Sequence, residues 1–142
     1  RITTGDSSLS HSVQSVLAAE VGDEDLALQH FEHVLFMDLA NWAGNAEDGV
    51  HIASAGGVWL SLVYGFAGVR DDQGNLSFDP RLPASWTELS FSLRVRGHTI
   101  AVRLQHDALY LHLREGEATS VIVRSEEIAL RPREETRVPL AP

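Results

Sequence analysis

The residues best suited to bind an anion lie at the starts of two expected helices in this chain of 142 residues. Ser7 and Ser8 precede the first helix, and His51 directly precedes an apolar, glycine-bearing segment. A helix N-terminus presents backbone N–H groups without intrahelical acceptors, together with the positive end of the helix dipole. Two hydroxyls and a histidine at such ends would suit a phosphate. Plain capping by Ser7 and Ser54 is the alternative that the spacing leaves open.

Carboxylates accompany both segments and suggest a different chemistry. Asp6 adjoins the serine pair, and Glu47 and Asp48 lie in the loop before His51. Hydrolysis of a glycosidic bond uses a pair of acids. Acidic loops are also common on an acidic surface, so a solvated loop is the alternative for these residues.

The remaining histidines suggest little chemistry. His30 and His33 are three residues apart on an expected helix, and two such side chains could begin a metal site. The sequence indicates no third ligand, so we expect surface histidines and no metal. Trp42, in the loop, is the tryptophan placed to stack on a sugar, whereas Trp59 and Trp86 are expected in the core.

Composition narrows the classes of protein. The chain has 20 acidic and 11 basic residues and a formal net charge of -9, which disfavours nucleic acids and anionic membranes as partners. It has no cysteine, so disulfides, thiolate metal sites and a cysteine nucleophile are excluded. With 44% hydrophobic residues the composition is that of a globular protein, and no apolar run is long enough to cross a bilayer.

The first half has helical periodicity. A first helix should follow the capping residues 6–8 and end at Gly22, which suits a left-handed C-cap. Asp23 should cap a second helix, and a loop should cover 41–49. A third helix is expected over 54–66, and it is apolar on every face, which is typical of a buried helix. Its glycines at 56–57 would allow a close approach to the backbone. The two earlier apolar series are Leu9, Val13, Val16, Leu17 and Leu28, Phe31, Val34, Leu35, Leu39.

The second half alternates with the period of strands. Strands are expected over 89–95, 99–105, 108–114, 120–124, 128–131 and 136–140, with a hairpin turn at 97–98. Short alternating strands at this spacing predict an antiparallel sandwich or barrel. The fold class is therefore α+β, with a helical part at 1–70 and a β domain at 71–142. Three such apolar helices need further helices around them, so the chain should be the end of a larger helical domain followed by a β domain.

Four stretches of the sequence and one tryptophan together carry a family resemblance. They are the residues at 3–10, 47–59, 65–70 and 76–83, followed by Trp86. In this order and spacing they resemble the C-terminal end of glycoside hydrolase family 65, which contains inverting disaccharide phosphorylases and some hydrolases. The resemblance covers essentially the whole chain. It implies the last helices of an (α/α)6 barrel at 1–70 and a small antiparallel β-sandwich at 71–142.

The resemblance also implies roles for particular residues. Ser7, Ser8 and His51 match the family's phosphate-binding residues, whereas the general acid, a glutamate, is expected upstream of this chain. The parent protein would cleave an α-linked glucose disaccharide with inorganic phosphate, giving β-glucose 1-phosphate and glucose. It would need no cofactor and no metal, and it would be cytoplasmic. Its partners would be the two substrates and the upstream part of the same enzyme, with a homodimer left open and with no nucleic acid or membrane.

Three alternatives accompany this interpretation. Gly5 stands where many of the family's phosphorylases have histidine, which keeps a hydrolase open, with Asp6 or Glu47 as the base. The isolated chain could also be a non-catalytic structural module, because the acid lies outside it. A carbohydrate-binding β domain is the third alternative, although Tyr110 and Trp86 are its only large amphipathic rings.

Overall fold

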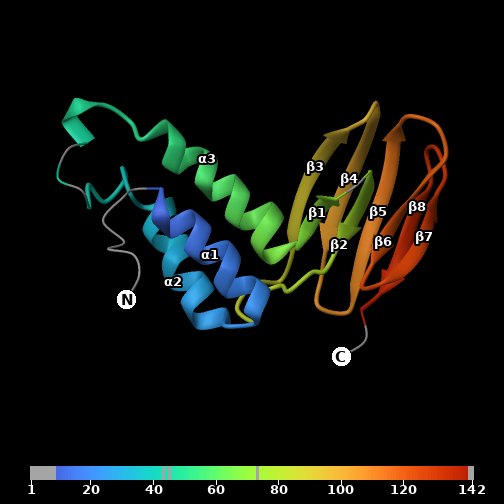
Figure 1. The fold of residues 1–142 in the computed structure, drawn as a ribbon, viewed down its shortest axis with the longest axis horizontal. Helices are drawn as coiled ribbons and strands as arrows, with labels where there is room; N and C mark the ends of the chain where they lie inside the picture. The colour runs from blue at the N-terminus through green and yellow to red at the C-terminus, as the bar shows by residue number, and fades with distance from the viewer. Residues whose placement is uncertain (1–8, 43, 45, 73, 141–142) are drawn as a thin grey trace. The chain divides into compact units, whose positions relative to one another are not determined.

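The structure, a computed structural model, describes residues 9–42, 44, 46–72 and 74–140. By its internal contacts the chain divides into two compact units, and the boundary along the sequence falls between Phe66 and Ala67. The first unit holds the helices and the second holds the strands (Figure 1). The α+β prediction is therefore confirmed. The first strand already begins at Val69, within the part that the sequence analysis assigned to the helices.

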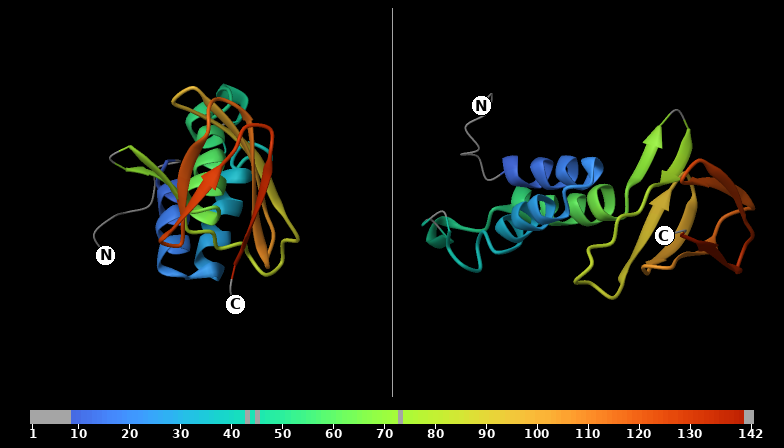
Figure 2. Two further views of the ribbon diagram at one scale, coloured as in Figure 1. Left: turned by 90° about the vertical axis from the view of Figure 1, so that its right-hand side faces the viewer. Right: turned by 90° about the horizontal axis from the view of Figure 1, so that it is seen from below.

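Three α-helices pack against one another in the described part of the helical unit (Figure 2). They are α1 (Ser10–Val21), α2 (Glu24–Leu35) and α3 (Ile52–Leu60), and a short 3-10 helix (Ala46–Asp48) lies in the connection before α3. A π-helical segment (Ser61–Phe66) continues α3. Two of the predicted caps are present: Gly22 adopts φ 82°, and the Asp23 side chain accepts a hydrogen bond from the Leu26 N–H at 3.1 Å. The other two are wrong, because α1 begins after Leu9 without a side-chain cap and α3 begins after His51, which leaves Ser54 buried inside the helix.

Small side chains, rather than the apolar series, form the packed face of α1. Its buried residues are Ser12, Ser15, Ala18 and Ala19. The Ser15 hydroxyl donates to the Ala27 carbonyl of α2 at 3.0 Å, so the buried hydroxyl is satisfied. The apolar side chains that alternate with this face are exposed, and they are Leu9, Val13, Leu17 and Val21. The helix exists as predicted, but within this unit its larger apolar face has no cover.

The β unit contains two four-stranded sheets. The first has the order β1–β2–β6–β7, formed by Val69–Asp72, Asn75–Phe78, Thr119–Val123 and Glu126–Leu130. The second has the order β3–β4–β5–β8, formed by Leu89–Val95, His98–Leu104, Ala108–Glu115 and Glu135–Pro139. Alternate residues of both sheets are buried, as in Leu109, Leu111 and Leu113 of β5. The sandwich prediction is thus confirmed.

Two details of the β unit differ from the sequence predictions. β2 pairs with β6 in parallel, with Ser77 opposite Ile122, whereas all the other described pairs are antiparallel. The β3–β4 turn is made by Arg96 and Gly97, one residue earlier than expected, with φ values of 49° and 80°. Two successive positive φ values characterise the tight two-residue hairpin turn whose twist matches that of the strands. No helix among the described residues is long and apolar enough to cross a membrane.

Candidate functional site

The predicted anion-binding residues differ in what the structure says of them. Ser7, Ser8 and the neighbouring Asp6 lie outside the described residues, and their place in the site stays a prediction. His51 is described, and it is the N-cap residue of α3, with φ −77° and ψ 79°. Its side chain makes no capping hydrogen bond to the helix, so the ring is available for another partner.

That partner is Asp38, which binds His51 through both carboxylate oxygens. Oδ1 lies 2.5 Å from the ring Nδ1, and Oδ2 accepts the His51 backbone N–H at 2.9 Å. Both side chains are partly buried, with 21% of His51 and 27% of Asp38 exposed. Because one carboxylate binds both the ring and the backbone N–H of His51, the orientation of the ring relative to the backbone is restricted.

The local fold explains how these two residues meet. The helix α2 ends at Leu35, and a series of turns follows, in which the Ala40 N–H donates to the Phe36 carbonyl at 2.8 Å. Asp38 lies within these turns, and the loop then returns the chain to the start of α3. The contact between Asp38 and His51 therefore joins the two ends of this connection.

The electrostatics of the pair favour an ionised carboxylate. The hydrogen bond from the His51 ring lowers the pKa of Asp38, and the bond from the His51 backbone N–H lowers it further. A carboxylate can only accept hydrogen bonds, so the Nδ1 atom that faces it must carry a proton. Nε2 is then the ring nitrogen left for a ligand. Residues 9–66 contain no lysine or arginine, so histidines are the only cationic donors that this stretch can supply.

Two other predicted residues of the loop do not join this pair in the structure. Glu47 lies exposed in the 3-10 helix, and the carboxylate that contacts His51 belongs to Asp38 instead. Trp42 packs its ring against His33, with 4.5 Å between ring centroids, and remains 49% exposed. Trp59, expected in the core, is 45% exposed, because the neighbours within this unit cover only part of its helix face.

Of the two neighbouring glycines in α3, only Gly57 allows close packing against another helix. A Cβ on Gly57 would lie 2.7 Å from the Ser12 Cβ of α1, whereas a Cβ on Gly56 would meet nothing within 4 Å. The close approach predicted for this pair is therefore made by α1.

The histidines of α1 and α2 form a cluster that the sequence analysis missed. His11 stacks on His33 with 3.7 Å between ring centroids, and its Nδ1 lies 2.9 Å from Nδ1 of His30. Burial lowers the pKa of His11, and repulsion from His33 and His30 adds to it. Burial and His33 lower the pKa of His30 in the same direction. Among the described residues, no group of three or more histidines or acids is arranged to hold a metal.

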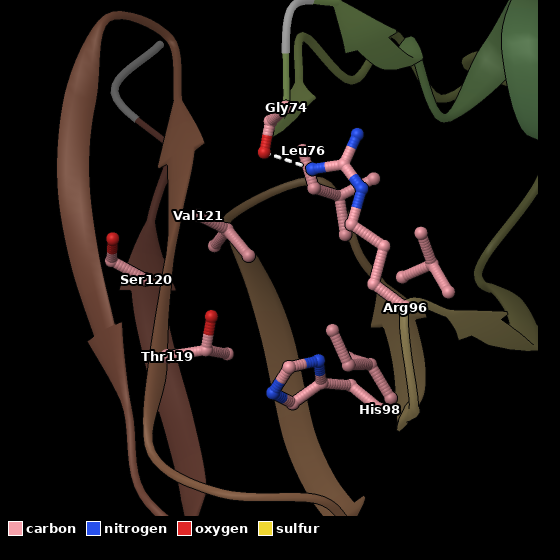
Figure 3. Close-up of a pocket in the computed structure, with 9 residues that line it drawn as sticks. Gly74, Leu76, Arg96, His98, Thr119, Ser120 and Val121 are labelled. Atoms are coloured by element: carbon pink, nitrogen blue, oxygen red, sulfur yellow. Dashed lines mark hydrogen bonds between the residues drawn. The ribbon is translucent and has the colours of Figure 1, made fainter.

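The β unit has a pocket of its own, of about 170 Å³ (Figure 3). Arg96 of the β3–β4 turn and His98 at the start of β4 line it, with Thr119 of β6 across from them. The Arg96 guanidinium donates to the Gly74 carbonyl and pairs with Asp71. This cation therefore links two hairpins.

Two arginines of the same unit contact the side chain of Tyr110. The Arg103 guanidinium lies 3.8 Å from the centre of the ring, and the Arg137 Nε donates to the Tyr110 hydroxyl at 3.3 Å. A sugar needs an uncovered aromatic face for stacking, and this arrangement covers one face of the ring. The face of Tyr110 under Arg103 is therefore closed to a sugar.

Asp38 is thus the residue that sequence reasoning missed. It precedes His51 by 13 residues and falls near the end of the apolar series of α2, where no motif marks it. The sequence offered only the fact that residue 38 is acidic, which says little in a chain with 20 acidic residues. The pairing arises from the turns after α2, and these turns have no periodic pattern.

Comparisons with known proteins give the family. Residues 1–60 match the model of the glycosyl hydrolase family 65 central catalytic domain. Residues 69–130 match the model of the glycosyl hydrolase family 65 C-terminal domain. The two matches follow each other in the same order as the helical and β units.

Relatives of known name agree with these matches. The chain is 41% identical to an alpha,alpha-trehalose phosphorylase of Thermoanaerobacter brockii over 91% of its length, and 39% identical to a maltose phosphorylase of Bacillus subtilis over 97%. A kojibiose phosphorylase of Halothermothrix orenii is 38% identical over 74% of the chain. The chain spans only 17%, 18% and 14% of these three relatives.

A solved structure shares the fold. It is a protein from the human microbiome, provisionally named a kojibiose phosphorylase, and it aligns with 99% of this chain at a TM-score of 0.90 and 24% identity. The chain covers 20% of that structure. With both family models matched along its length, the chain belongs to glycosyl hydrolase family 65.

Proposed function

We propose that this chain is the C-terminal part of an inverting disaccharide phosphorylase and supplies residues that bind its phosphate. Ser7, Ser8 and His51 are the proposed phosphate ligands. The observation that carries the proposal is the His51 ring, which is held by Asp38 at the N-cap of α3 while Nε2 remains for a ligand. Relatives named as trehalose, maltose and kojibiose phosphorylases support the same reaction class.

The chemistry suits an anion site of this kind. Phosphate attacks the anomeric carbon of an α-glucoside from the face opposite the leaving sugar, and one phosphate oxygen bonds to that carbon. The bond to the glycosidic oxygen breaks, and a glutamate from the upstream part of the enzyme protonates this oxygen. The products are β-glucose 1-phosphate and the released sugar. Hydroxyl, imidazole and helix N–H donors would hold the phosphate in line without a competing carboxylate at the nucleophile.

The helical unit would complete a larger (α/α)6 barrel in this proposal. The exposed apolar stripe of α1 supports it, because large apolar side chains in a row usually mark an interface. The upstream part of the same enzyme would cover this stripe. The β unit would then be the C-terminal β-sandwich, and the protein would act in the cytoplasm with no cofactor. A homodimer is compatible with the proposal.

The test is a substrate assay on the intact protein. Trehalose, maltose and kojibiose are each incubated with and without inorganic phosphate, and β-glucose 1-phosphate is quantified. We expect one of them to be cleaved only when phosphate is present. Cleavage at the same rate without phosphate, giving glucose alone, would identify a hydrolase and overturn the proposal.

A second measurement separates the role of this chain from that of the upstream part of the enzyme. The isolated 142-residue chain is expected to show no turnover of any of the three sugars, since the general acid would be missing. Turnover by this chain alone would place the acid within it and contradict the assignment of roles.

A further inference from the structure

The carboxylate of Asp38 has a more specific arrangement than an ordinary ion pair. Its two oxygens contact different donors of the same residue, the ring Nδ1 and the backbone N–H of His51, at 2.5 and 2.9 Å. A carboxylate that bridges the side chain and the backbone of one residue restricts the rotation of that side chain. The imidazole of His51 is thus oriented from the side opposite to Nε2.

We infer that Asp38 is a positioning residue that prepares His51 for phosphate, an inference that rests on the proposed function. Asp38 itself would not touch the substrate. The carboxylate favours the tautomer with the proton on Nδ1. A neutral imidazole therefore offers the Nε2 lone pair to a P–OH group. A protonated imidazole offers an Nε2–H to a phosphate oxygen, with its positive charge balanced by Asp38. Both states present the same ring nitrogen in the same direction.

The hydrogen-bond pattern shows why an amide cannot replace this carboxylate. An asparagine at 38 has one oxygen and one NH2 group, whereas His51 directs two N–H donors at the carboxylate. If the amide oxygen accepts the backbone N–H, the NH2 group faces Nδ1 and requires the other tautomer. If the oxygen faces Nδ1–H, the NH2 group opposes the backbone N–H. A loss of orientation is therefore expected from Asp38→Asn with almost no change in size.

Kinetics of the intact protein test the inference. Asp38→Asn should raise KM for phosphate by about tenfold or more, because a hydrogen bond to a charged group is lost. KM for the disaccharide should change by less than about twofold. Asp25→Asn is the matched control, since it makes the same chemical change at an exposed position in the first turn of α2. A merely structural role for Asp38 would affect both KM values alike.

A double-mutant comparison shows whether Asp38 acts through His51. In a His51→Gln background, adding Asp38→Asn should cost almost nothing further, because the residue being positioned is absent. If Asp38→Asn costs as much in this background as in the wild type, the inference is overturned. Thermal unfolding of all variants identifies any loss that comes from misfolding.

The tautomer of His51 provides a readout independent of activity. Ring 15N shifts, assigned by comparison with His51→Gln, should show a protonated Nδ1 in the wild type and in Asp25→Asn. Asp38→Asn should reduce this signature even if the fold is unchanged, because the amide NH2 group favours the other tautomer whenever it faces Nδ1. A wild type without phosphate-dependent cleavage would overturn the proposed function. A phosphate-dependent wild type with a normal Asp38→Asn variant would overturn only the role of Asp38.

Discussion

Gly57 of α3 lies so close to Ser12 of α1 that no side chain fits between them. A Cβ placed on Gly57 would be 2.7 Å from the Ser12 Cβ and 2.9 Å from its hydroxyl oxygen. The next contact, Cγ1 of Val34 on α2, would be at 3.4 Å. All three helices thus meet at this glycine. Since α3 begins directly after His51, the same contact helps to determine where that ring lies.

Gly57→Ala should therefore loosen the helical unit. The added methyl group must displace Ser12 or separate the helices, at a cost of about 1–3 kcal/mol, which at least offsets the gain of ~1 kcal/mol in helix propensity. We expect faster amide hydrogen exchange in α1 and α3 of the intact protein. Gly56→Ala is the matched control, because a methyl there meets no described residue within 4 Å. If both variants show unchanged or slower exchange, the close contact at Gly57 is wrong.

The histidine cluster should make the helical unit sensitive to acid. The pKa values of His11 and His30 lie below their ordinary value of 6.5 in the folded state. As the pH falls through that value, the unfolded chain takes up protons before the folded one, so the free energy of unfolding decreases. Protonation of both rings also abolishes the hydrogen bond between the Nδ1 atoms of His11 and His30. Stability is retained above about pH 7 and lost progressively below it.

His11→Gln should weaken this pH dependence. Protection factors of the amides in α1 and α2, measured at about pH 5.5 and 7.5 in the intact protein, should differ less in the variant than in the wild type. His112→Gln, in the other unit, is the control and should leave the dependence unchanged. Equal protection of the wild type at both pH values would contradict the prediction.

How far the sequence could predict the fold depends on the kind of signal. Helices and strands were found because burial imposes periods of 3.6 and 2 on the sequence, and Gly22 and Asp23 mark a helix end and start by their chemistry. The parallel β2–β6 pairing was missed because register between residues far apart, such as Ser77 and Ile122, leaves no local pattern. The hairpin turn was placed one residue late because Arg96 takes a positive φ that favours glycine or asparagine.

The candidate site could be predicted only in part, for a related physical reason. His51 was identified because a helix start has recognisable neighbours in the sequence. Asp38 was not, because irregular turns bring it to His51 and an acid in an acidic chain carries little information. The buried face of α1 was also unexpected, since close helix packing selects small residues such as Ser12 and Ser15 rather than large apolar ones.

Two glycines with positive φ should respond very differently to alanine. Gly97 has φ 80° and open space where a Cβ would be added, so Gly97→Ala should cost about 1–2 kcal/mol from the backbone conformation alone. Gly68 has φ 59°, and a Cβ there would overlap the Asp79 carbonyl. Its own carbonyl accepts the Asp79 N–H at 3.1 Å, which holds the two segments together. Thermal unfolding of the β unit should therefore show a larger loss for Gly68→Ala than for Gly97→Ala. Equal losses would mean that Asp79 moves away without cost.

The exposed stripe of α1 allows a direct test of the proposed barrel. Leu17 is 54% exposed in the structure, where a charged substitution would have little effect. If the upstream part of the enzyme covers this face, Leu17→Asp in the intact protein removes buried apolar area and introduces a charge into an interface. The expected loss is at least about 2 kcal/mol, seen as a lower melting temperature and a smaller soluble fraction. Gln29→Asp, at an exposed polar position of α2, introduces the same side chain and should be tolerated. An intact Leu17→Asp variant as stable as Gln29→Asp would mean that nothing covers this face of α1.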